Sequence, residues 1–133
     1  DKVLSECLIS ENGSTDISNC FGTALAVCET HFPDAVVVPL ECWEQELAVW
    51  NRLLDSTYQA LIKDLKQRAY GEFEASINEA QRHWIAQKDM DCRLEVASTP
   101  QTYDVIWPAC QAEASMHRVA FLRDLTGADW TPY

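Results

Sequence analysis

The sequence is poor in glycine and free of long apolar runs. Only four glycines occur in 133 residues, and a glycine content this far below average favours helices over strands joined by turns. No apolar run approaches the roughly 18 residues that a membrane-spanning helix needs, so we expect no membrane insertion. A phosphate-binding loop, a dinucleotide-binding glycine motif and a nucleophile elbow are all missing as well. We therefore expect no cofactor and no enzymatic activity.

Basic side chains are also scarce. The chain has 10 Lys and Arg against 21 Asp and Glu, a net charge of −11. A nucleic-acid-binding protein needs a basic surface to neutralise phosphates, so this charge argues against nucleic acid as a partner. It favours a basic protein partner, which complementary charge would attract. The same charge also serves solubility.

Six cysteines and a first residue that is Asp1 instead of Met are the most informative features present. Small cytosolic proteins seldom carry so many cysteines, because thiols stay reduced in that compartment. An even number in a short chain predicts up to three disulfides. We interpret the chain as a periplasmic or secreted protein whose signal peptide has been removed.

The apolar spacing predicts an all-α, disulfide-stapled bundle of about four helices. We expect a polar N-terminal arm at residues 1–15 and a single helical domain at 16–133. The segment 43–65 gives the clearest signal, because apolar residues recur there every three or four positions over six turns. The predicted helices cover about 16–30, 43–65, 73–94 and 108–126.

The same spacing predicts which residues face the core of the last two helices. For the third helix the expected inner residues are Phe73, Ile77, Ala80, Trp84 and Leu94. For the last helix they are Cys110, Ala114, His117, Phe121 and Leu125. His117 is therefore interpreted as a core histidine. Of the five tryptophans, only Trp107 and Trp130 are expected outside the core.

Helix geometry restricts how the cysteines can pair. Within one helix, Cys20 and Cys28 would lie about 12 Å apart along the axis, whereas a disulfide requires Cα atoms within about 7 Å. Two cysteines that flank the connection between consecutive helices are natural partners. The favoured pairs are therefore Cys92–Cys110, Cys28–Cys42 and Cys7–Cys20, with Cys7–Cys28 and Cys20–Cys42 as the alternative set.

Three strings of residues resemble a known family. They are Cys42-x3-Glu46-x3-Trp50-x7-Tyr58, Gln81-Arg82-x-Trp84-Ile85-x3-Asp89-x2-Cys92, and the later pair Cys110 and Arg118. This pattern resembles the DUF1311 family, also called the LprI-type lysozyme-inhibitor domain, over about residues 20–125. The chain departs from it at Asn51 and Lys88, where members more often carry Asp and Arg.

The resemblance implies an exported bacterial domain that binds another protein and is not an enzyme. The expected partner is a basic hydrolase such as lysozyme, engaged by the acidic surface. The loop 98–107 or the segment 32–39 could present the binding group. The alternative is a structural or stress-related module of the cell envelope with another protein as its partner.

Four polar residues coincide with the family motif: Glu46, Arg82, Asp89 and Arg118. Because they lie beside apolar stripes, we interpret them as an ion-pair network that ties the helices together. Catalysis by paired carboxylates is disfavoured, since Asp89 and Asp91 would point about 200° apart on a helix.

A zinc site is disfavoured on spacing. His83, Cys92, Cys110 and His117 lack the close pairing that zinc sites use, and disulfides account for the cysteines. We therefore expect no metal ion.

Overall fold

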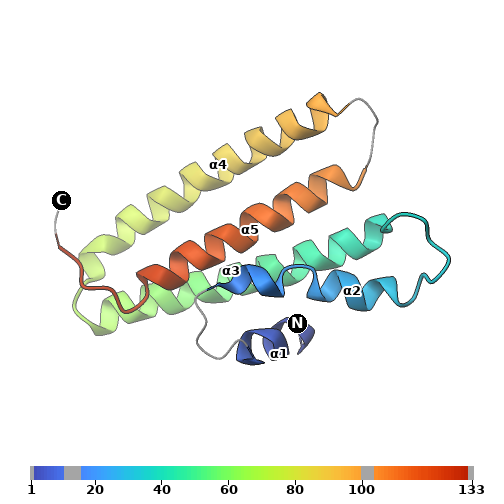
Figure 1. Ribbon diagram of the computed structural model, residues 1–133. Coiled ribbons are helices and arrows are strands. Elements are labelled where there is room, and N and C mark those ends of the chain that lie inside the picture. Colours follow the sequence, from blue (N-terminus) through green and yellow to red (C-terminus); the bar gives the residue numbers. More distant parts are fainter. Residues whose placement is uncertain (1, 11–15, 100–103, 132–133) are drawn as a thin grey trace.

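The computed structural model describes residues 2–10, 16–99 and 104–131, which form helices and connecting turns without a β-strand (Figure 1). Three disulfides join them. The elements, in chain order, are α1 Lys2–Ser10, η1 Ile17–Cys20, α2 Thr23–Glu29, α3 Leu40–Gln67, η2 Gly71–Phe73, α4 Glu74–Ser98 and α5 Ile106–Leu125, where η is a 3-10 helix. The prediction of an all-α, disulfide-stapled bundle is confirmed.

The core forms along the line where α5 packs against the 28-residue α3. Trp50, Leu61 and Leu65 of α3 are fully buried there, together with Val119 and Leu122 of α5. Figure 1 shows α4 on the other side of α5 and α2 along α3, while α1 lies beside η1 and α2. Burial of these apolar side chains is the main contribution to the stability of the bundle.

The polar arm expected at residues 1–15 contains a helix instead. Residues 2–10 form α1, and Leu4 is only 3% exposed in a cluster with Trp50 and Val119. The spacing of Leu4, Cys7 and Leu8 places three apolar groups on one face of this helix. The helix has only nine residues, so this pattern extends over little more than two turns. Residues 11–15 of the expected arm lie outside the described residues.

The helix predicted for residues 16–30 is broken in two. Asp16 begins the 3-10 helix by accepting a hydrogen bond from the Ser18 backbone N–H at 3.0 Å. Gly22 then adopts φ = 90°, a left-handed conformation that favours glycine. The chain changes direction there before α2 starts at Thr23.

The disulfides join neighbouring elements. Their pairs are Cys7–Cys20 between α1 and η1, Cys28–Cys42 between α2 and α3, and Cys92–Cys110 between α4 and α5. This is the first of the two sets that the spacing left open. No cysteine remains free, so a thiol nucleophile is not available in this oxidised form.

The buried face of α5 differs from the predicted face. The buried positions include Ala112, Met116, Val119 and Leu122, whereas Phe121 is 47% exposed. His117 is also exposed, with its Nε2 3.8 Å from a carboxylate oxygen of Glu113. The expectation of a core histidine is wrong, because apolar residues occur all round α5 and the buried face is opposite the predicted one, so that His117 lies away from the core.

The inner face predicted for α4 is correct only at its start. Phe73 and Ile77 are buried, but Ala80 is exposed and Leu94 is 66% exposed. Farther along α4, Cys92 is the buried position and is joined to α5 by its disulfide. The apolar pattern predicted a continuous stripe that the neighbouring helices do not cover.

Adjacent residues in α5 test the corrected face. We expect Leu122→Ala to lower the free energy of unfolding by about 3 kcal/mol, as truncation of a fully buried leucine usually does. Phe121→Ala should cost less than about 1 kcal/mol, because that ring is half-exposed. Urea unfolding with the disulfides intact measures both values, and the reverse order would contradict this packing.

Candidate functional site

Glu46 is the most deeply buried of the motif carboxyl groups, with no exposed surface. Its two oxygens accept three hydrogen bonds. The Gly22 and Leu25 backbone N–H groups donate at 2.9 Å each, and the Trp50 indole Nε1–H donates at 2.5 Å. Glu46 therefore joins α2 to α3 through backbone groups and not through an arginine.

The position of Glu46 explains how α2 can begin without a capping side chain of its own. Gly22 is the N-cap residue and has no side chain to accept a bond from the first turn. The carboxyl group of Glu46 takes that role from the neighbouring helix. A negative group also interacts favourably with the positive end of a helix dipole.

The other three motif residues do not complete a network with Glu46. Asp89 accepts a hydrogen bond from Gln111 Nε2 at 3.1 Å, and Arg118 Nε donates to Gln81 Oε1 at 2.5 Å. Arg82 is exposed. All four residues are described, and no ion pair or hydrogen bond joins any two of them. The glutamines, which the sequence analysis did not assign a role, are the partners that link α4 to α5.

Arg118 and Lys88 both lie over aromatic rings. The Arg118 Cζ atom is 5.5 Å from the Trp84 ring centroid and 4.7 Å from that of Phe121, and Lys88 Nζ is 4.8 Å from Trp84. Burial lowers the pKa of both cations, while the charge of nearby Asp89 partly opposes this for Lys88. The cation–π contacts offset part of the cost of burying these charges.

The acid pair and the zinc ligands weighed from the sequence do not form sites. Asp91 accepts a hydrogen bond from Gln87 at 2.8 Å and is exposed, whereas Asp89 is bonded to Gln111. His83 is exposed beside Glu79. Within the described ranges, no three His, Cys, Asp or Glu side chains gather as a metal site, and no helix is long and apolar enough to cross a membrane.

The connection between α2 and α3 is held at both ends. The Cys28–Cys42 disulfide closes its base with the two Cα atoms 5.4 Å apart. Backbone N–H groups of His31 and Phe32 donate to carbonyls of α2, and that of Ala35 donates to Phe32 at 3.1 Å. Figure 1 shows this connection at the end of the bundle where α3 begins. In the other candidate loop, residues 100–103 lie outside the described residues.

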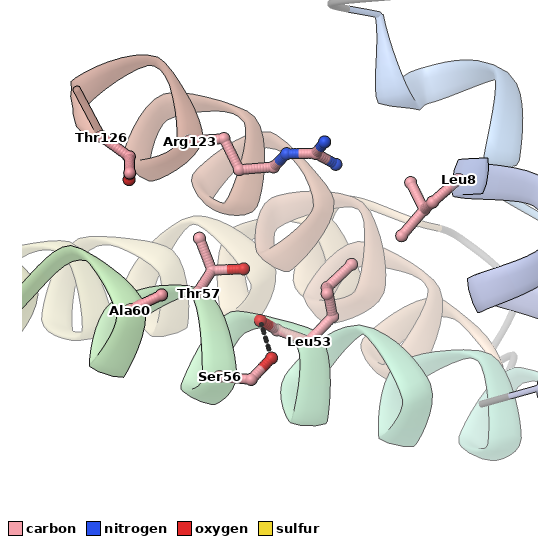
Figure 2. A pocket seen from close by; sticks show the side chains of 7 residues that line it. All are labelled: Leu8, Leu53, Ser56, Thr57, Ala60, Arg123 and Thr126. Atoms are coloured by element: carbon pink, nitrogen blue, oxygen red, sulfur yellow. Dashed lines mark hydrogen bonds between the residues drawn. The ribbon is translucent and has the colours of Figure 1, made fainter. Parts of the chain in front are cut away.

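Open grooves flank α3 on two sides. One has a volume of about 480 Å³, and Figure 2 shows Leu8 of α1, Thr57 of α3 and Arg123 of α5 on its sides. The Ser56 hydroxyl there donates to its own helix at the Leu53 carbonyl, 3.0 Å away. Among the described residues, no carboxylate or histidine lines this groove, so they provide no acid–base pair for catalysis there.

The second groove has a volume of about 330 Å³ and lies between α3 and α4. Tyr58 and Asp55 line it from α3, with Trp84 and Lys88 opposite them on α4. The Asn51 side chain, which also lines it, accepts a hydrogen bond from Ser115 of α5 at 2.8 Å. The groove combines aromatic and polar side chains but has no nucleophile oriented by a base.

Comparison with known proteins places this architecture in a family. The model of the LprI family, described as lysozyme inhibitor LprI, matches residues 34–122. The match covers most of the chain, from the middle of the α2–α3 connection to the last buried turn of α5, and the chain belongs to this family. No curated protein and no solved structure matches it.

A substitution at Glu46 tests its role in holding α2. Glu46→Ala leaves the Gly22, Leu25 and Trp50 N–H groups without their acceptor, so we expect the free energy of unfolding to fall by at least about 3 kcal/mol. Glu44→Ala is the matched control, because Glu44 is exposed on the same helix; its effect should stay within about 0.5 kcal/mol. Equal urea midpoints for the two variants would contradict the assignment.

Proposed function

We propose that this protein is an exported, non-enzymatic inhibitor that binds a basic hydrolase of the lysozyme type. The family match supports a lysozyme as the partner. Three disulfides fit an oxidising compartment such as the periplasm or the outside of the cell. The described side chains offer no convergent acid, base and nucleophile, so binding is the function that the surface supports best.

The observation that carries the proposal is the uneven distribution of charge. Residues 1–51 contain nine acidic side chains and one basic side chain, Lys2, whereas residues 52–133 contain twelve and nine. Eight of the eleven net negative charges therefore lie in the first 51 residues. Among the described residues, α2, the α2–α3 connection and the first turns of α3 carry no Lys or Arg.

Such a surface suits a strongly basic enzyme. Opposite charge raises the rate at which two proteins meet and orients them before contact. An inhibitor of this kind blocks the substrate cleft by occupying it and needs no chemistry of its own. Binding should then depend on ionic strength, because dissolved salt screens exposed charges beyond about 8 Å at 150 mM.

The test is the clearing of a bacterial cell suspension by lysozyme in the presence of the oxidised protein. We expect inhibition that weakens at least about tenfold between low and physiological ionic strength. The reduced and alkylated chain keeps the acidic side chains without the disulfides, and it should not inhibit. The assay should be run with c-type lysozyme and with lysozymes of other types.

Two results would overturn the proposal. Failure to inhibit any lysozyme would favour the alternative, an envelope module that binds a different protein. Equal inhibition by the reduced and alkylated chain would show that negative charge alone is sufficient and that the folded surface is not what binds.

A further inference from the structure

The α2–α3 connection exposes two valines that the fold does not use. Val36 is 99% exposed and Val37 is 74% exposed, the two highest values among the large hydrophobic residues of the described ranges. We call this pair the valine tip. On either side of it, Phe32 and Val38 are half-buried.

The two adjacent valines offer apolar surface to a partner. Covering each of them on binding is worth roughly 1.5–3 kcal/mol before the costs of association are subtracted, so the pair can contribute to affinity. Val is also branched at Cβ and has few rotamers to lose. The valine tip can therefore gain contact area at little cost in side-chain entropy.

The backbone that carries the tip is already ordered. The Cys28–Cys42 disulfide closes its base, and Pro33 and Pro39 fix φ on both sides of the tip. At the opposite end of α2, Glu46 holds the first turn of that helix against α3. Because the connection does not have to be ordered on binding, the entropy cost that weakens flexible loops is reduced.

Acidic side chains surround the tip in sequence and are exposed. Glu29 precedes it at the end of α2, Asp34 lies two residues before Val36, and Glu41 and Glu44 follow in the first turns of α3. His31 is the one side chain of this region that can become positive, since Lys and Arg are absent between Lys2 and Arg52.

We propose that the valine tip and these four carboxylates, which we call the acidic ring, form the surface that docks into the cleft of a basic protein. Val36 and Val37 enter an apolar part of the cleft, while the carboxylates pair with Lys and Arg at its rim. This inference rests on the proposed function and specifies the site that performs it.

The charge around the tip decides between possible occupants. An anionic lipid surface would repel the four carboxylates, and a nucleic acid would do so as well. A second copy of this chain would bring the same acidic ring against itself, and like charges facing each other across an interface are unfavourable. A basic protein can cover the apolar valine tip and can also pair its Lys and Arg side chains with the acidic ring.

The experiment compares direct binding of four variants and the parent protein to immobilised c-type lysozyme. Val36→Ser with Val37→Ser removes the apolar tip. Its matched control is Met90→Ser with Leu94→Ser, a second exposed apolar pair, on α4 (56% and 66% exposed). Glu41→Gln with Glu44→Gln reduces the acidic ring, and its control is Glu72→Gln with Glu95→Gln, also exposed.

We expect the tip variant to raise Kd by at least about tenfold, mainly through faster dissociation. The ring variant should slow association by about threefold or more and reduce its dependence on salt. Both control variants should bind within about twofold of the parent. All four should melt within a few degrees of the parent, since the substituted side chains are exposed.

The outcomes separate the two proposals. If the parent binds lysozyme and the tip variant binds equally well, the docking site is wrong while the proposed function stands. If the tip variant and its α4 control lose affinity equally, the site is also wrong, because any exposed apolar pair then has the same effect. If the parent does not bind any lysozyme, the proposed function and this site both fall.

Discussion

The buried carboxyl group of Glu46 is the interaction on which the N-terminal part of the structure depends. It lies in the core beside Trp50 and accepts the backbone N–H groups that start α2. A helix of seven residues is too short to be stable alone, so α2 exists because α3 supplies its cap and the Cys28–Cys42 disulfide holds its other end. Together these two connections support the segment that carries the valine tip.

Charge and covalent links are distributed in a related way. The first 51 residues carry most of the negative charge and also two of the three disulfides. Self-repulsion among carboxylates opposes compact structure. Of the described side chains of α1 and α2, Leu4 and Cys28 are the buried ones. Disulfides restrict the unfolded chain and so stabilise the fold against that repulsion. They do this without burying the acidic side chains. The acidic surface can therefore stay exposed for a partner.

Prediction from the sequence succeeded where a pattern was long or a geometric limit was strict. The stripe of α3 was recognisable because it repeats over six turns, and Trp50, Leu61 and Leu65 are buried as expected. It failed for α5, where apolar residues occur all round the helix and so do not mark one face. The role of Glu46 was also unpredictable in detail, since two of its three partners are backbone groups, which a pattern of side chains does not show.

The sequence by itself determined the all-α class, the family and the acidic character of the chain, because composition, helical periodicity and motif spacing are local properties. Only the tertiary structure decided which face of α5 is buried, that α1 belongs to the core, and that Glu46 caps α2. It also showed that Val36 and Val37 are left exposed. These features depend on which elements pack together, and packing is a property of distant residues that spacing along the chain does not specify.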